Sequence, residues 1–162
     1  MRRAALAVLI GGLAVMWIYV LFLAKPETGD RLADRSFSTA AEPVCKATVD
    51  QLREAGVVNQ PAASPQERAA LVDRGDALLA QMVDQLRALV PASGEVHDAV
   101  AKWLADWDQW LRDRAAWSQK LHAGEDTPFN ERQRDNGEPN SKALNAFAII
   151  NDMPSCQTPI GI

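Results

Sequence analysis

The stretch that decides the fold is EVHDAVAKWLADWDQWLRDRAAWSQKL, residues 95–121, which holds four of the five tryptophans in the chain. Steps of three and four residues define one stripe along it, made of Val96, Val100, Trp103, Trp107, Trp110, Arg114, Trp117 and Leu121. This spacing is typical of one face of an α-helix. Charged and amide side chains fill the opposite face, so the sequence predicts a long amphipathic helix over 96–121.

The tryptophans of this stripe allow two interpretations. Trp103, Trp110 and Trp117 repeat every seven residues and form one ridge, with Trp107 beside it. We expect the ridge to be the core of a small bundle, because a tryptophan side chain buries a large area. The alternative is an exposed aromatic docking surface, since tryptophan is enriched where binding energy concentrates. Arg114 interrupts the stripe and must reach water or a carboxylate.

The N-terminal 24 residues, MRRAALAVLIGGLAVMWIYVLFLA, contain 21 uncharged residues in a row, the length that spans a bilayer as a helix. Phe22 stands where a cleavage site needs a small residue, which favours a retained signal anchor over a cleaved signal peptide. Arg2 and Arg3 precede the apolar run, so the positive-inside rule places the N-terminus in the cytoplasm. The sequence thus predicts a single-pass protein of the cytoplasmic membrane, anchored through residues 4–24, with its C-terminal domain outside.

The remaining residues divide into a tether and one domain. Residues 25–41 have few large apolar side chains and no sustained period, which predicts a flexible tether. Turn and capping signals divide the predicted domain, 42–162, into helices over 42–56, 65–90, 96–121 and 141–152. The first of them is expected to open at Glu42-Pro43, because proline suits the first helical position.

The strongest local signal is a capping box, Ser64-Pro65-Gln66-Glu67, at the start of the second of these helices. The short connection 91–94 then predicts an antiparallel hairpin of two long helices. Since no run alternates with period two, we predict an all-α domain, an up-down-up-down four-helix bundle. The polar stretch 124–140 is either a small hairpin with an Asn136-Gly137 turn or an irregular loop.

The hairpin also predicts a register. Facing positions should sum to roughly 185 if the turn lies at 91–94, which gives three facing pairs: Gly75 with Trp110, Leu78 with Trp107, and Met82 with Trp103. A glycine facing Trp110 would leave room for the indole ring. The same arithmetic places Arg114 within reach of Asp73, and we expect an ion pair there or near Asp113 that stabilises the bundle.

Cys45 and Cys156 are the only cysteines, and their spacing matches no metal site. An even number of cysteines outside the cytoplasm favours a disulfide. In the predicted bundle, the start of the first helix and the end of the fourth lie at the same end, so the two cysteines should meet. We expect this bond at the end near the membrane, with the 91–94 turn projecting away from it towards partners.

Charge and motif content exclude several classes of function. Of the 17 Lys and Arg, three lie at or before Lys25, so 14 face 21 Asp and Glu in the rest of the chain. This excess of acidic residues argues against nucleic acid as a partner. His97 and His122 stand 25 positions apart on one helix, roughly 37 Å, and cannot share a metal ion. No nucleophile, phosphate-loop or metal motif is present, so we expect neither catalysis nor a cofactor.

The residues DWDQWLRDRAAW (106–117) and FAIINDMPSCQTP (147–159) resemble a group of actinobacterial membrane-anchored proteins of unassigned function. Members of that group carry a pattern like WLxDWxxYxxDRxxYxxxL, followed by a C-terminal NxMxxC. This chain has Trp110 and Trp117 where that pattern has tyrosine. The resemblance covers about a third of the chain and implies an anchor, an extracytoplasmic domain and this fold. It names no activity.

Two functions remain open at this point. The first is a non-catalytic interaction or accessory module for a cell-envelope assembly, with another envelope protein as its partner. The alternative is a binder of an apolar small molecule or lipid in the bundle core. A cavity lined by the tryptophans would favour the ligand binder, and an exposed apolar strip would favour the interaction module.

Overall fold

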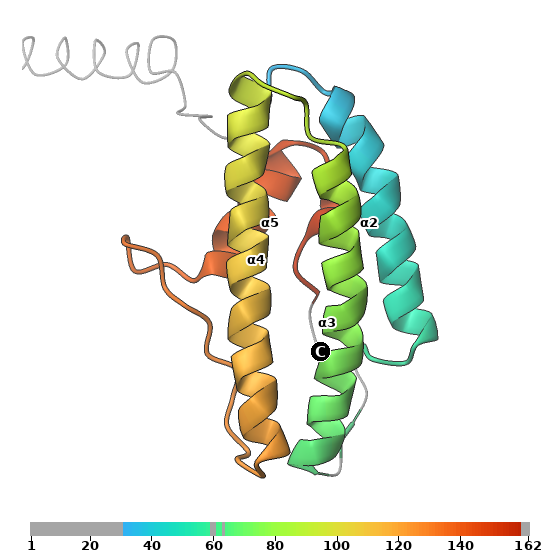
Figure 1. Ribbon diagram of the computed structural model, residues 1–162, viewed down its shortest axis with the longest axis vertical. Helices are drawn as coiled ribbons and strands as arrows, with labels where there is room; N and C mark the ends of the chain where they lie inside the picture. The colour runs from blue at the N-terminus through green and yellow to red at the C-terminus, as the bar shows by residue number, and fades with distance from the viewer. Residues whose placement is uncertain (1–30, 59–60, 63, 160–162) are drawn as a thin grey trace, which may run out of the picture.

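The computed structural model describes residues 31–58, 61–62 and 64–159, which form four packed α-helices (Figure 1). The helices are α2 (Ser36–Glu54), α3 (Pro65–Ala88), α4 (Glu95–His122) and α5 (Asn140–Ile150), followed by the short 3-10 helix η2 (Pro154–Cys156). Within these ranges the only β-type pairing is an isolated bridge between Gln133 and Pro139. The predicted all-α class and the packing of four helices are confirmed.

The two long helices α3 and α4 form the centre of the domain and run antiparallel (Figure 1). The periodicity of the tryptophan stretch located α4 to within one residue at each end. At the start of α3, the Ser64 hydroxyl accepts a hydrogen bond from the backbone N–H of Glu67 at 3.2 Å, with Pro65 at the first helical position. The predicted cap of α3 is therefore confirmed.

Removing this cap should have a measurable cost. We expect Ser64→Ala to lower the free energy of unfolding by about 1 kcal/mol, because one N–H of the first turn loses its acceptor. Urea denaturation followed by circular dichroism measures the change. Ser93→Ala, an equivalent substitution at an exposed site in the α3–α4 turn, is the matched control and should leave stability within about 0.5 kcal/mol.

Helix α2 begins earlier than predicted. It starts at Ser36, so residues 36–41 are helical and do not belong to a tether, and the predicted start at Glu42-Pro43 is wrong. A single stripe continues through the first two turns, and its buried members are Phe37, Ala41, Cys45, Thr48 and Leu52. Burial of this stripe outweighs the loss of one backbone donor at Pro43, which lies inside the helix with its ring exposed.

An acidic residue marks the true start of α2. The Asp34 carboxylate accepts hydrogen bonds from the backbone N–H and the hydroxyl of Ser36, both at 2.9 Å. These bonds hold the pKa of Asp34 below its usual value. A carboxylate at this position also interacts favourably with the positive end of the helix dipole.

The α3–α4 turn lies at the same end of the bundle as the start of α2, whereas the α2–α3 connection and the end of α4 lie at the opposite end (Figure 1). The expectation that this turn projects away from the tether is therefore wrong. The reason is topological. Because α2 and α3 run in opposite directions, the end of α3, where the turn begins, lies at the same end of the bundle as the start of α2.

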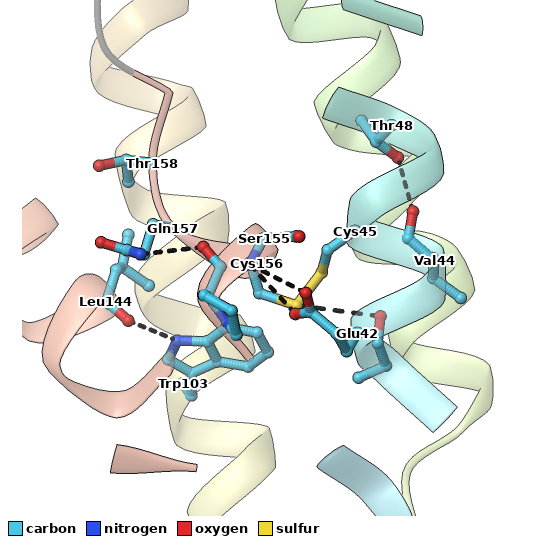
Figure 2. The surroundings of a disulfide bond; sticks show 12 residues. Glu42, Val44, Cys45, Thr48, Trp103, Leu144, Ser155, Cys156, Gln157 and Thr158 are labelled. Atoms are coloured by element: carbon cyan, nitrogen blue, oxygen red, sulfur yellow. Dashed lines mark hydrogen bonds between the residues drawn. A yellow bond between two sulfur atoms is a disulfide. The ribbon is translucent and has the colours of Figure 1, made fainter. Parts of the chain in front are cut away.

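The predicted disulfide between Cys45 and Cys156 is confirmed, with 5.0 Å between the two Cα atoms (Figure 2). Both residues are fully buried. Cys45 lies in the middle of α2 and not in its first turn, because the helix starts earlier than expected. Beside the bond, the Glu42 carboxylate accepts the backbone N–H of Ser155 at 3.1 Å, so α2 and η2 are joined twice (Figure 2).

The predicted membrane anchor, residues 4–24, falls outside the described ranges. Among the helices that the structure describes, none combines the length and the apolar character that crossing a bilayer requires.

Candidate functional site

The tryptophan ridge lies in the core of the domain. Trp103, Trp107 and Trp110 keep only 2, 0 and 3% of their surface exposed. Their rings meet edge to face, at 6.3 Å between the first two centroids and 5.6 Å between the second two. The Trp103 Nε1 donates to the carbonyl of Leu144 at 3.2 Å (Figure 2). The docking-surface interpretation is therefore wrong for these three side chains, and their apolar surface is used within the fold.

Trp117 is the half-buried member of the ridge, and the segment after α4 covers it. Its Nε1 donates to the carbonyl of Thr127 at 2.7 Å. The Phe129 ring lies 5.4 Å from Trp117 and 6.0 Å from Trp110, measured between centroids. The polar stretch 124–140 thus places one aromatic side chain over the end of the ridge.

This stretch combines both predicted alternatives. Around Asn136-Gly137 it forms a minimal hairpin: the Arg134 N–H donates to the Glu138 carbonyl at 2.9 Å, and Gly137 adopts a φ of +78°. The remainder is irregular and is bonded to α4. The backbone N–H of Arg132 donates to the Asp113 carboxylate at 2.8 Å. A small hairpin is therefore present, but its turn is centred on Asp135-Asn136, with Gly137 donating to the Arg134 carbonyl at 2.8 Å, and the predicted central pair Asn136-Gly137 is wrong by one residue.

Arg114, the residue that interrupts the stripe, forms a buried ion pair with Asp76. Its Nε lies 2.5 Å from Asp76 Oδ1, and the two side chains are 1% and 16% exposed. The guanidinium also stacks over the Trp110 ring, 4.8 Å from its centroid, and lies 5.8 Å from that of Phe129. This arrangement suits arginine, whose planar group pairs with a carboxylate and stacks on aromatic rings at once.

The expected partner, Asp73, was wrong by one helical turn. Helical side chains lean towards the N-terminus of their own helix. In an antiparallel pair, the side chains of the two helices therefore lean in opposite directions. A side chain on α4 then contacts a residue of α3 that lies a few positions closer to the C-terminus of α3 than the backbone register predicts. The correction of three positions from Asp73 to Asp76 agrees with that shift. Gly75 is buried as expected, and its facing to Trp110 stays a prediction.

Burial makes Asp76 an unusual carboxyl group. Desolvation raises its pKa, the charge and hydrogen bond of Arg114 counteract this, and the nearby charge of Asp73 adds to the rise, so the pKa stays above its ordinary value. Its Oδ2 atom is buried and has no hydrogen-bond partner within the described part of the chain. Asp76 is therefore held in its charged form mainly by Arg114.

Asp73 joins two other residues at the solvent edge of the same interface. Its carboxylate accepts the hydroxyl of Ser118 and lies 2.7 Å from Nε2 of His122. Burial alone would raise the pKa of Asp73, but the hydrogen bonds from Ser118 and His122, together with the charge of His122, outweigh it and lower the pKa. Sequence reasoning missed this cluster because its members come from two helices.

The cluster contains serine, histidine and aspartate but not the geometry of a hydrolytic triad. In a triad, the histidine stands between the serine and the aspartate and accepts the serine proton. Here serine and histidine each bond to the aspartate instead, and Ser118 is only 2% exposed. The arrangement stabilises the α3–α4 interface and offers no activated nucleophile.

The lowered pKa of Asp73 predicts a dependence of stability on pH. A carboxyl group whose folded pKa is depressed stabilises the fold above its unfolded pKa of about 3.8, and this contribution disappears as the pH falls through the folded pKa. We therefore expect the stability difference between wild type and Asp73→Asn to be present at about pH 6 and to shrink towards about pH 2. Urea midpoints across this range test it. A difference that does not change with pH would contradict it, and Asp135→Asn, at an exposed site, serves as the control.

Cavities beside the tryptophans are small. The one at Trp103 has a volume of about 30 Å³, and the one at Trp117 about 130 Å³. The first has space for about one water molecule. A drug-sized ligand needs a cleft of at least about 300 Å³, so neither cavity fits the alternative of an apolar ligand in the core.

Two larger hollows lie on the surface of α4. The first, about 390 Å³, is polar and is lined by Asp106, Gln109, Asn140 and residues 132–136 of the loop. The second, about 430 Å³, is a mainly apolar groove lined by Arg87, Val90, Pro91, Ala92, His97, Ala101, Leu104, Ala105 and Asp108. We call the second hollow the hairpin groove, since the α3–α4 turn forms its end.

Polar contacts define the rim of the hairpin groove. Arg87 bridges to both carboxylate oxygens of Asp108, at 2.9 and 3.0 Å. His97 Nδ1 lies 2.8 Å from the carbonyl of Pro91, which fixes the turn against α4. Among the described residues, no three His, Cys, Asp or Glu side chains converge as a metal site would require. The groove is thus an apolar surface with a polar rim.

Comparisons with known proteins add no relationship: no protein-family model matches the chain, and no match was found among the curated proteins or the solved structures. The resemblance to the actinobacterial group stays a prediction.

Proposed function

We propose that this chain is a non-catalytic, membrane-anchored module: an up-down-up-down bundle outside the cytoplasmic membrane that binds another protein of a cell-envelope assembly. The hairpin groove is the observation that carries the proposal. The groove has a volume of about 430 Å³, a mainly apolar lining and charged side chains at its rim, and an apolar centre with a polar rim is typical of a protein–protein interface.

The disulfide supports the proposed compartment. A Cys45–Cys156 bond buried in the core persists where the surroundings are oxidising, as they are outside the cytoplasm. The uncharged run 4–24, preceded by Arg2 and Arg3, predicts the matching orientation. Together they favour an anchor in the membrane and a domain outside it.

Site-specific photocrosslinking in intact cells tests the proposal. A photoreactive phenylalanine at Ala101, an exposed residue that lines the hairpin groove, should yield a discrete crosslinked adduct with one envelope protein. The matched control is the same residue at Ala115, also exposed on α4 and about 21 Å further along the helix. Equal adducts at both sites, or none at Ala101, would contradict a partner in this groove.

A companion measurement tests the compartment. A membrane-impermeant thiol reagent, applied to whole cells after mild reduction, should modify Cys45 and Cys156 once the domain is denatured in place. Modification that requires broken cells would place the domain on the cytoplasmic side and overturn the proposed orientation.

A further inference from the structure

The large apolar side chains that the described residues leave exposed come from the α3–α4 turn and the last turn of α5, in the half of the bundle where α2 starts (Figure 1). They are Leu89, Ile149 and Ile150, at 36, 58 and 36% exposure. Leu89 follows α3 at the α3–α4 turn, and the two isoleucines are the last residues of α5. Beside them, the Asn151 side chain accepts the backbone N–H of Leu32 at 2.8 Å. The exposed isoleucines therefore lie next to the point where the chain leads back towards residues 1–30.

We infer that this end of the domain, which we call the apolar end, rests on the lipid bilayer in which the chain is anchored. The inference rests on the proposed anchor at residues 4–24. From Ala24 to Arg31 there are seven residues, which reach at most about 25 Å when fully extended. Helix α4 alone, with 28 residues, is about 42 Å long, so the tether is shorter than the bundle. The apolar end is thus held within reach of lipid.

The charges near this end favour an apolar contact over attraction to anionic headgroups. Arg35 is paired with Asp152, and Arg87 with Asp84 and Asp108. Arg35 and Arg87 are thus already engaged with carboxylates. Arg31, exposed beside Leu32, has no ion pair among the described residues, but Glu95 and Asp98 in the first turn of α4 outnumber it. A lipid contact would therefore depend on insertion of Leu89 and the isoleucines at the interface, and neutral phosphatidylcholine should suffice.

Methyl NMR on the full chain in phosphatidylcholine nanodiscs, with a gadolinium chelate on a fraction of the headgroups, tests the contact. The full chain has six isoleucines, of which Ile149 and Ile150 are the two in the described part, and their assigned methyl signals report on the apolar end. Ala123, exposed at the far end of α4, is the internal control. Ile10 and Ile18 lie within the predicted span and report on the anchor itself.

Tethering alone would bring this end near lipid, so a second variant separates proximity from contact. Insertion of about 20 Gly and Ser residues after Asp30 adds a flexible reach of about 25 Å. We expect Ile149 and Ile150 to stay more broadened than Ala123 in this variant. Replacing both isoleucines by serine should then lower the equilibrium constant of the contact about tenfold, read on the methyl of Ala92 in the α3–α4 turn. Both sites are exposed, so the serine variant should fold, and an unchanged Leu144 methyl signal verifies this.

The outcomes separate the two proposals. Equal broadening of isoleucine and Ala123 methyls in the long-tether variant would overturn the lipid contact while the anchor stands. Broadening that appears only with anionic lipid would also overturn it, since the contact would then be electrostatic. Unbroadened Ile10 and Ile18 signals would show that the anchor itself is absent and would contradict the proposed function.

Discussion

Replacing Cys45 and Cys156 together by alanine should lower the free energy of unfolding by about 4 to 5 kcal/mol. The bond closes a loop across 111 positions, and in the chain-entropy model a loop of this size restricts the unfolded chain by that amount. A domain of this size has a total stability of about 5 to 15 kcal/mol, so the variant should be close to unfolding at physiological temperature. Urea denaturation at 25 °C measures the loss, and the m-value should rise because the uncrosslinked chain exposes more surface.

Reduction provides the internal control for this prediction. Dithiothreitol should destabilise the wild type by about the same 4 to 5 kcal/mol and leave the double alanine variant unchanged. Cys45→Ala alone should behave like the double variant, apart from a free thiol at Cys156. A loss below about 1 kcal/mol in both experiments would mean that the disulfide restricts the unfolded chain little and that the bond is not a main source of stability.

Elements that depend on local periodicity and capping could be predicted from the sequence. Helix α4 follows from the seven-residue repeat of large apolar side chains, and the start of α3 follows from Ser64, because both signals act within one or two turns. The disulfide was predictable for a different reason. With two cysteines there is a single pairing, and the helical topology brings both to the same region.

The start of α2 could not be predicted from local rules alone. Proline at position 43 is compatible with a helix start, and that interpretation placed the start of α2 six residues too late. Tertiary packing determines where α2 starts. The Phe37 ring packs edge to face on Trp103, at 6.3 Å between centroids, and is 2% exposed. A distant helix thus supplies the burial that makes two further turns of α2 stable.

The side-chain clusters were the least predictable part of the site. The sequence singled out Arg114 as needing a carboxylate, and it has one, but the identity of that carboxylate depends on side-chain lean across the hairpin. The placement of Phe129 over Trp117 depends on an irregular loop for which no periodic signal exists. Asp73 was recognised only as a partner for Arg114 and instead bonds to Ser118 and His122.

Breaking the buried pair by Asp76→Asn should destabilise the domain by about 4 to 5 kcal/mol, and Arg114→Met by about 3 kcal/mol. The two differ because their remaining charges differ. Arginine keeps its proton at any accessible pH, so Arg114 would stay charged at 1% exposure opposite a neutral amide. Asp76, with a pKa that burial already raises, can take up a proton when Arg114 is removed.

This difference gives the two variants opposite responses to acid. Because burial holds the folded pKa of Asp76 above its unfolded value, ionised Asp76 destabilises the fold, and the wild type gains stability as the pH falls through the folded pKa. Removing Arg114 raises this pKa further, so Arg114→Met gains more and its deficit relative to wild type should shrink. Asp76→Asn has no carboxyl group at this position and misses that gain, so its deficit relative to wild type at the same pH should grow. Urea midpoints for all three proteins at about pH 7 and pH 4 measure the effect.

The double variant Asp76→Leu, Arg114→Met removes both charges and replaces them with apolar side chains of similar volume. With Asp76→Leu measured as the second single variant, the double variant should be more stable than either single variant, with a coupling energy of about 2 to 3 kcal/mol. Strict additivity would show that the two residues contribute independently, through packing on Trp110 and Phe129 alone. A coupling energy of that size would show that Arg114 is tolerated in the aromatic ridge because Asp76 neutralises its charge. The pair would then be a structural part of the core, and a partner would bind the outer surface of the bundle.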